Sequence, residues 1–195
     1  MAARIAKQEG REPVRAASAE TRAKLVAAAA KEFNQHGYYG TDSNKIARRA
    51  GFAPQTFYRW FRDKTEIFVA AYRLWEEQER EMLSKLIVAR ASGGDLVDAA
   101  VAHHRAYRIF RRSLRTLSYD EPDVRAARAQ SRIRQIESIK AWNKPTRVTT
   151  AEIGTILLQM ERLADALAES EFDDLGLDEK AAKTALAQLQ SSLRR

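Results

Sequence analysis

The sequence predicts an all-α protein, and three features of its 195 residues support that fold class. Only 8 glycines and 4 prolines interrupt the chain, which leaves room for long helices. No run of alternating β-branched residues indicates a strand, whereas apolar residues recur at helical spacing. There are no cysteines, which excludes a disulfide framework and a thiolate metal site. We therefore expect helices throughout, joined by short turns.

The first helix is expected to begin at Ser18 and to end at Gly37. Serine is a favoured N-cap residue, and Leu25, Ala29 and Phe33 then share one helix face. Residues 1–17 have no sustained apolar period, so we expect a basic flexible arm there.

Two short helices follow. Asp42 can cap the first, which ends at Gly51, and Pro54 opens the second. Two short helices joined by a tight turn form a helix-turn-helix. Asp63 and Glu66 then form an Asp-led capping box, from which a long helix starts. The predicted domains are the arm at 1–17, the helix-turn-helix domain at 18–62 and a helical domain at 63–195.

The helical domain is expected to be a bundle with a C-terminal helical hairpin. Alternating spacings of four and three predict one buried seam over residues 96–117. The members of that seam are Leu96, Ala100, His103, Tyr107, Phe110, Leu114 and Leu117. Pro122 opens the next helix, whose inward-facing residues are expected to be Ile133, Ile136, Ile139 and Trp142. Amphipathic helices at about 150–169, capped by Thr149 or Thr150, and at 177–193 complete the bundle.

Positive charge is concentrated in the N-terminal third. Residues 1–64 hold 13 Lys and Arg against 6 Asp and Glu, a net charge of +7 out of +8 for the whole chain. Such a concentration is the usual electrostatic footprint of phosphate-backbone binding, although a solvated basic surface has the same composition. Because the helix-turn-helix lies in the same third, we predict that the chain binds double-stranded DNA.

The outward-facing residues of the second short helix suit that partner. They combine an amide, a hydroxyl, aromatic rings and a cation, groups that match base edges, thymine methyls and phosphates. With three residues outside that helix, the predicted DNA-binding set is Thr41, Lys45, Gln55, Thr56, Tyr58, Arg59, Trp60 and Lys64.

Residues 20 to 70 resemble the DNA-binding domain of the TetR family of transcriptional regulators. The matching residues are Gly37-Tyr38, Thr41, Ile46-Ala47, Ala50-Gly51, Phe57-Tyr58, Phe61, Lys64 and Ile67-Phe68. The C-terminal two thirds resembles the family only in helical layout.

The resemblance implies a role for individual residues. Tyr58 and Lys64 would contact phosphates, Gln55 and Thr56 would lie closest to bases, and Thr41 would touch the DNA backbone. The chain departs from the family at Ala53, where Ser is common, so the recognition helix is expected to lack a side-chain cap.

The family resemblance also implies a homodimeric repressor that leaves a palindromic operator when it binds a small-molecule effector. The alternative is an architectural nucleic-acid-binding protein that senses nothing. The large C-terminal bundle favours the regulator, because an architectural protein needs no domain of that size.

The predicted effector pocket uses aromatic and thioether side chains as an adaptable apolar wall, with a histidine and a phenol to orient the ligand. Its residues are Trp75, Met82, His103, Tyr107, Phe110, Trp142 and Met160. The predicted dimer interface is a four-helix arrangement of the last two helices of each chain. Its residues are Ile153, Ile156, Met160, Leu163, Leu186, Leu189 and Leu193.

Residues 105–147 hold 12 Lys and Arg against 4 Asp and Glu, a second positive excess. Four of these arginines lie near Tyr107 and Phe110 in the sequence: Arg108, Arg111, Arg112 and Arg115. One hypothesis is an anionic effector with an apolar body. The alternative is a solvated stripe beside acidic helices.

No enzyme signature stands out, whether a Ser-His-acid constellation, a glycine-rich phosphate loop or paired carboxylates. His36, His103 and His104 point in different directions, so we expect no catalytic residue, no metal and no cofactor. No segment approaches the roughly 18 apolar residues of a membrane span, and the N-terminus is too charged for a signal peptide. We expect a non-enzymatic cytoplasmic protein that contacts no membrane.

Overall fold

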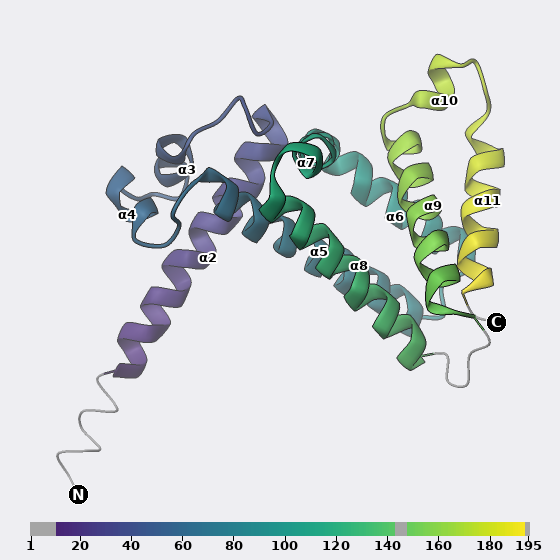
Figure 1. The fold of residues 1–195 in the computed structure, drawn as a ribbon, viewed down its shortest axis with the longest axis horizontal. Helices are drawn as coiled ribbons and strands as arrows, with labels where there is room; N and C mark the ends of the chain where they lie inside the picture. The colour runs from purple at the N-terminus through teal and green to yellow at the C-terminus, as the bar shows by residue number, and fades with distance from the viewer. Residues whose placement is uncertain (1–10, 143–147, 194–195) are drawn as a thin grey trace, which may run out of the picture. The chain divides into compact units, whose positions relative to one another are not determined.

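The computed structural model describes residues 11–142 and 148–193, and every element within these ranges is a helix (Figure 1). This confirms the predicted all-α fold class. The chain divides into two compact units, residues 1–74 and 75–195, here called the N-terminal unit and the C-terminal unit. α5 (Lys64–Val88) contributes its first turns to the N-terminal unit and the rest to the C-terminal unit. The division therefore lies later in the chain than the capping box at residue 63.

The N-terminal unit consists of α2 (Arg11–His36), α3 (Ser43–Arg49), α4 (Pro54–Tyr58) and the start of α5. α2 begins seven residues before Ser18, so the predicted start is wrong. A proline in the first turn of a helix is tolerated, which allows Pro13 to lie near this start. The helices enclose a core whose fully buried aromatic members are Phe33, Phe57, Phe61 and Phe68.

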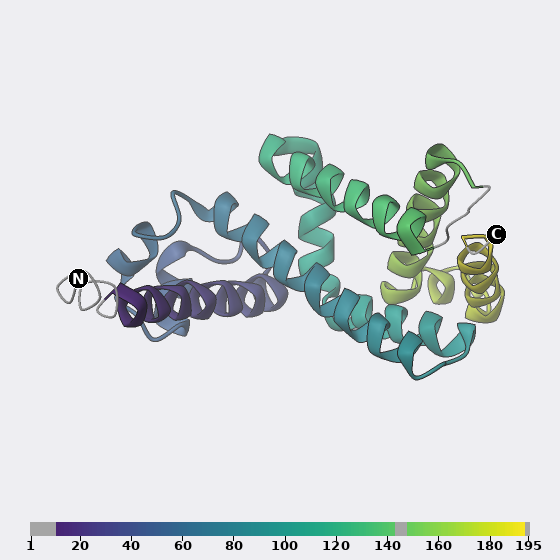
Figure 2. The same ribbon diagram turned by 90° about the horizontal axis from the view of Figure 1, so that it is seen from below.

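The C-terminal unit contains the remainder of α5, then α6 (Gly93–Ala106), α7 (Arg108–Asp120), α8 (Pro122–Trp142), α9 (Thr150–Ala168), α10 (Glu171–Asp174) and α11 (Glu179–Ser192). Three of these helices, α6, α9 and α11, pack on one another and share an apolar core. The buried residues of that core are Val97, Val101, Leu167, Ala182 and Leu186. Figure 2 shows the helices of the C-terminal unit from below, coloured from teal through green to yellow.

The predicted seam over residues 96–117 is interrupted. Tyr107 ends α6 and precedes α7, with φ −114° and ψ 23°. Within α6 the predicted Leu96 is buried, but the rest of the buried row, Val97, Val101 and His104, lies one position later than predicted. His104 is 5% exposed and His103 is half-buried, so the prediction that His103 is the core histidine is wrong.

α8 buries a different face from the one expected. Its buried residues are Val124, Ala127 and Ser131, while Ile133 is 54% and Trp142 is 68% exposed. Ile136 and Ile139 are half-buried. A hydrogen bond from Ser131 to Glu76 of α5 accompanies this orientation. Because two residues correspond to about 200° of helix rotation, Ile133 lies on nearly the opposite side.

A separate property of these helices concerns membranes. Within the described ranges, none is both long and apolar enough to cross a bilayer.

Candidate nucleic-acid interface

The helix-turn-helix is built from local signals in the sequence. The Asp42 side chain caps α3 by accepting a hydrogen bond of 2.8 Å from the Lys45 amide. Gly51 adopts φ +80° in the turn, a conformation that strains other residues. α4 starts at Pro54, and Ala53 gives it no side-chain cap, as the sequence predicted. Phe57 anchors α4 in the core.

α4 (Pro54–Tyr58) and the turn after it present a mixed polar and aromatic surface. In α4, Gln55 is exposed and Thr56 is half-buried. Arg59, exposed, and Trp60, half-buried, lie in the turn rather than in the helix where they were predicted. Tyr58 is 61% exposed, and its hydroxyl lies 2.8 Å from the Ser43 hydroxyl of α3. This hydrogen bond fixes the phenol beside the start of α3, a contact that the sequence pattern did not reveal.

Lys64 is held at the first turn of α5. Its Nζ donates to the carbonyl oxygens of Tyr38 at 2.9 Å and Thr41 at 3.1 Å, and lies 4.2 Å from the Tyr38 ring centroid. Burial lowers the pKa of Lys64, and the charge of Asp42 opposes that effect. An ammonium has three N–H groups, so the two carbonyls leave one N–H without a carbonyl acceptor. The exposed Tyr39 ring lies 6.0 Å from the same nitrogen.

Thr41 has a structural role that differs from the predicted one. Its side chain is buried, and its hydroxyl donates to Glu32 at 2.8 Å. The hydroxyl is therefore engaged inside the N-terminal unit, which corrects the expectation that it contacts DNA. Lys45 is exposed, and its Nζ donates to the Gly40 carbonyl at 3.2 Å.

Glu32 links α2 to α3. The carboxylate is 6% exposed and accepts hydrogen bonds from Arg49 and Thr41. Burial opposes its charge, but these bonds outweigh that effect and lower the pKa of Glu32. The ion pair fixes the helix that precedes the turn, and sequence reasoning missed it. The available signal was an acidic residue next to the apolar face of Leu25, Ala29 and Phe33.

Three residues of the predicted effector pocket lie together in the C-terminal unit. The Trp75 and His103 rings stack with centroids 5.1 Å apart, and the His103 and Tyr107 rings are also 5.1 Å apart. The Tyr107 hydroxyl donates to Gln78 at 3.1 Å. Phe110 is fully buried in the same unit. We call Trp75, His103 and Tyr107 the ring cluster.

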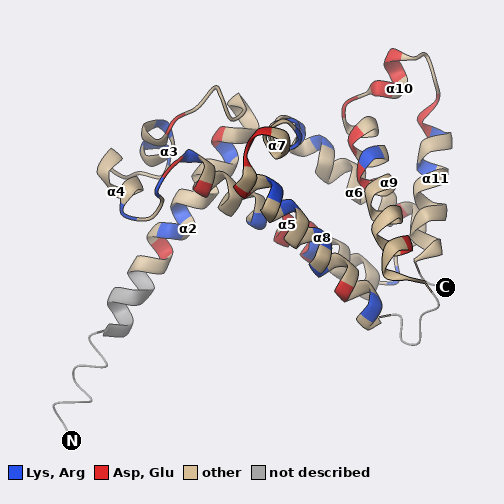
Figure 3. Cartoon of the chain, viewed as in Figure 1, with Lys and Arg blue, Asp and Glu red and all other residues tan. Residues whose placement is uncertain are grey.

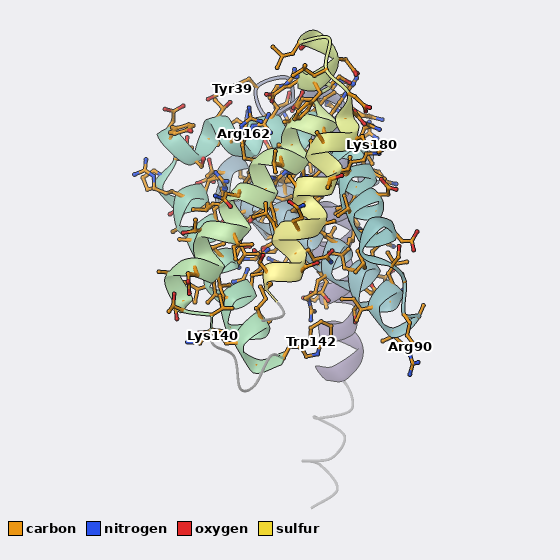
Figure 4. All side chains as sticks on the ribbon, turned by 90° about the vertical axis from the view of Figure 1, so that its right-hand side faces the viewer. Tyr39, Arg90, Lys140, Trp142, Arg162 and Lys180 are labelled. Carbon is orange, nitrogen blue, oxygen red and sulfur yellow. The ribbon has the colours of Figure 1, made fainter. Side chains whose placement is uncertain are left out.

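The other members of the predicted pocket lie elsewhere or contribute less. Trp142 lines a separate hollow of about 480 Å³ with Ile87, Arg90, Ala91 and Leu96. Figure 4 labels Trp142 and Arg90 at this end of the unit. Met160 packs against the core of α6, α9 and α11, and Met82 is half-buried. The structure therefore does not bring all seven predicted residues into one cavity.

The arginines of the second basic segment are largely neutralised within the chain. Figure 3 shows the Lys and Arg residues of α7 and the acidic residues gathered on α10. Arg111 is 2% exposed and bonds Glu161 at 2.7 Å and Asp165 at 3.1 Å. Arg115 lies 2.8 Å from Asp165, and Arg112 pairs with Glu169.

Further pairs extend this charged layer, because Arg128 and Arg132 of α8 both reach Glu161 of α9. Burial opposes the charge of Asp165, but hydrogen bonds and charges from His104 and Arg111 outweigh it and lower the pKa of Asp165. Arg111 and Arg115 thus act mainly as partners of α9, while Arg112 is exposed beside Glu169, as expected for a charged stripe next to an acidic helix. The anionic effector stays a hypothesis.

The predicted dimer residues divide into two groups. Ile153, Leu186 and Leu193 are buried inside a single chain, so they are not available to a second copy, and their assignment is corrected. The half-buried members are Ile156, Met160, Leu163 and Leu189. Leu158, which was not predicted, is 59% exposed on α9. In Figure 4 α9 and α11 lie side by side facing the viewer, with Arg162 and Lys180 labelled.

Residues 11–142 and 148–193 contain no group of three or more His, Cys, Asp or Glu that could hold a metal ion.

Comparison with known proteins adds independent information. Residues 25–71 match the family model described as bacterial regulatory proteins, tetR family. The uncharacterized HTH-type transcriptional regulator YdgC of Bacillus subtilis (strain 168) is 30% identical over 69 residues, which are 35% of this chain and 35% of that protein. The match therefore spans about a third of the curated relative.

Solved structures resemble this chain over most of its length. A transcriptional regulator from Rhodococcus sp. Rha1 has a TM-score of 0.64 at 17% identity, covering 88% of this chain and 95% of its own. A TetR family transcription regulator from Marinobacter aquaeolei VT8 has a TM-score of 0.56 at 17% identity, with coverages of 90% and 97%. The regulator FadR from Bacillus subtilis, solved with stearoyl-CoA, has a TM-score of 0.54 at 14% identity, with coverages of 85% and 95%. These likenesses show a shared fold.

Proposed function

We propose that this chain is a transcriptional regulator of the TetR family, a homodimeric repressor released from a palindromic operator by a small-molecule effector. The observation that carries the proposal is the helix-turn-helix, whose α4 exposes Gln55 and Tyr58 in a unit with excess positive charge. Because its site of action is DNA, we propose that the protein works in the cytoplasm.

α4 is the proposed recognition helix. Gln55 has the amide that pairs bidentately with an adenine edge, and Thr56 beside it can contact a thymine methyl. Tyr58 and the remaining N–H of Lys64 are proposed to contact phosphates, which position the protein without reading sequence. Arg59, Lys45 and Trp60 are proposed to complete the DNA-facing surface.

The dimer is proposed to form through α9 and α11. Most side chains in the exposed rows of these two helices are short or uncharged. A second copy can therefore approach closely. On α9 the row is Ala151, Thr155, Leu158 and Arg162, and on α11 it is Ala181, Thr184, Gln188 and Ser191. A twofold arrangement of two such faces gives a four-helix interface and sets two recognition helices for a palindromic site.

The effector is proposed to act at the ring cluster of the C-terminal unit. A regulator of similar fold holds stearoyl-CoA, which supports ligand binding in this class of domain. Because three arginines of α7, Arg111, Arg112 and Arg115, already pair with carboxylates, we propose that apolar and ring contacts, rather than these arginines, recognise the effector body. The effector shifts the protein away from the DNA-binding state only through its higher affinity for the other state.

The competing function, an architectural binder that coats DNA, makes a different prediction in a binding experiment. The affinity of the full chain is measured for a fragment selected from random DNA and for a scrambled fragment as salt is raised. A sequence-specific regulator prefers the selected fragment, by roughly 10³–10⁷ for typical cases. Equal affinities that fall together as salt rises would instead identify an architectural binder.

A further inference from the structure

A buried histidine in the C-terminal unit contacts two carboxylates on different helices. His104 of α6 is 5% exposed. Its Nδ1 lies 2.9 Å from Oδ1 of Asp165 on α9, and its Nε2 lies 3.2 Å from Oε1 of Glu79 on α5. We call Glu79, His104 and Asp165 the imidazolium bridge. Through it one side chain joins α5, α6 and α9.

The contacts themselves determine where the proton lies. An ionised carboxylate only accepts hydrogen bonds, and a neutral imidazole has only one N–H. Both ring nitrogens can donate only if His104 is protonated. With a neutral ring, one carboxyl group would have to carry a proton and donate it to the nitrogen that lacks one. Burial raises the pKa of each carboxyl, but bonds and charges from their partners outweigh it and lower the pKa of both Glu79 and Asp165. The proton therefore resides on His104.

The charged and titratable groups around His104 come from every helix packed against it. The charged groups are Glu79 of α5, Arg111 of α7 and Asp165 of α9, and His103 of α6 is a further titratable neighbour. Burial lowers the pKa of His103, so this neighbour is uncharged at neutral pH. Arg111 opposes the charge of His104, whereas the two carboxylates favour it.

The two carboxylates differ in what remains when His104 loses its proton. Asp165 keeps Arg111 at 3.1 Å and Arg115 at 2.8 Å. Glu79 has no second ion-pair partner of this kind, because among the described residues only His104 forms an ion pair with it. Loss of the proton thus leaves a carboxylate of α5, 16% exposed, without its ion pair. A buried charge without a partner is strongly destabilising.

We propose that the imidazolium bridge is a proton-operated link that holds α5 against α6 and α9, and that its loss at alkaline pH weakens operator binding. The effect on operator binding rests on the proposed function. α5 is continuous from Lys64, a proposed phosphate contact, to Glu79 and beyond. A change in the packing of α5 therefore involves the helix whose first turn carries a DNA contact.

The direction of the pH effect follows from His104. Burial opposes its charge, but the hydrogen bonds to Asp165 and Glu79 outweigh it and raise the pKa of His104. A raised pKa in the folded state stabilises the protein fully below the unfolded value of about 6.5. That stabilisation is lost as pH rises through the folded value. Operator affinity should therefore be constant through weakly acidic pH and fall on the alkaline side.

The first test measures the titration of His104 directly in the full chain. Imidazole carbon chemical shifts are followed by NMR from pH 5 to 10, and the His104 signal is assigned by its absence in His104→Gln. The same chain unfolded in urea serves as the reference, with an ordinary histidine value of about 6.5. We expect His104 of the folded chain to titrate above this reference and Glu79→Gln to lower its midpoint. A folded-state midpoint at or below the reference would overturn the proposal, whether or not the protein binds an operator.

The second test measures dissociation constants for a selected DNA fragment over the same pH range. A single linked proton changes the dissociation constant by at most tenfold per pH unit. We expect the wild-type constant to rise with a midpoint that matches His104, and the rise to disappear in Glu79→Gln. The matched control is Glu77→Gln, an exposed residue of the same helix that pairs with Arg80 and should keep the wild-type profile.

The outcomes of the two tests are separable. If no DNA fragment is selected at any pH, the proposed function fails while the NMR titration still decides the state of His104. If Glu79→Gln binds the fragment with an unchanged pH profile, the link between the bridge and DNA binding is refuted. Should His104→Gln fail to fold, Glu79→Gln alone provides both comparisons, with the buried histidine signal assigned by its shift in that variant.

Discussion

Replacement of Asp165 by Asn should be among the most destabilising single changes in the C-terminal unit. The Asp165 carboxylate is 2% exposed. Its Oδ1 lies 2.9 Å from His104, and each of its two oxygens accepts a hydrogen bond of 3.1 Å from Arg111. Arg115 lies 2.8 Å away. Asn keeps the shape but removes the charge, leaving the buried Arg111 with Glu161 as its remaining ion-pair partner. Breaking a buried pair in this way costs about 3–5 kcal/mol.

The matched control is a solvent-exposed ion pair that also involves α9. Glu171→Gln removes the ion pair with Arg162 of α9, whose side chains are 41% and 62% exposed. Exposed pairs contribute about 0–1 kcal/mol. Urea denaturation followed by circular dichroism at pH 7 should therefore show a clearly lower midpoint for Asp165→Asn and nearly none of this loss for Glu171→Gln.

The pH dependence gives a second check on the same variant. Partner charges lower the pKa of Asp165 despite its burial. Its contribution is therefore present above the unfolded value of about 3.9 and disappears as pH falls through the lower folded value. The stability difference between wild type and Asp165→Asn should persist at neutral pH and shrink in strong acid. If both variants lost equally little stability at pH 7, the charged layer would not be holding these helices together.

Three further predictions concern the proposed recognition helix α4 and the proposed dimer interface of α9 and α11. Ala53→Ser supplies the missing cap of α4 and should raise the free energy of unfolding by about 0.5–1 kcal/mol, measured by denaturation; no gain would mean that Pro54 already suffices. Tyr58→Phe should weaken binding to all DNA fragments alike, whereas Gln55→Ala should relax base preference at one position of each half-site, by about 1–3 kcal/mol; selection with each variant distinguishes them, and an unaltered motif with Gln55→Ala would remove its role in readout. Leu158→Arg should dissociate the dimer in sedimentation, whereas Leu175→Arg, at a more exposed residue outside both helices, should not; a dimeric Leu158→Arg protein would count against the α9 face.

Local signals were sufficient for much of the fold. Asp42 determines where α3 begins, and Gly51 and Pro54 determine where α3 ends and α4 begins. Each acts through its own backbone or a neighbour three residues away. The Thr149 cap of α9, with Glu152 completing a capping box, is of the same kind. Such features depend on a few consecutive residues, so a sequence contains the whole of the information that defines them.

The buried histidine and the pairing of the α7 arginines depend on contacts between residues far apart in the sequence, so local patterns did not reveal them. His103 and His104 differ by only about 100° around α6, and both orientations satisfy a helical apolar pattern. The selection of His104 depends on Asp165, which is 61 residues away. The arginines of α7 are similar, because their charge run gives no indication that carboxylates of α9 will neutralise it.

The apolar faces of the last two helices show a related ambiguity. Leu186 and Leu163 have the same residue type, yet Leu186 is buried in the chain's own core while Leu163 only packs against its edge. An apolar row indicates that a face is covered, but whether the cover is the same chain or a second copy depends on the three-dimensional arrangement of α6, α9 and α11.

Selection of bound fragments from random double-stranded DNA by the purified chain tests sequence-specific recognition most directly. We expect an enriched motif of two inverted half-sites whose centres lie one helical turn apart, about 10–10.5 base pairs, or a multiple of that distance. The symmetry of the motif reports the dimer, and its most constrained bases report Gln55 and Thr56. Recovery of fragments with no common motif, bound no better than the starting pool, would contradict the assignment of this chain as a sequence-specific regulator.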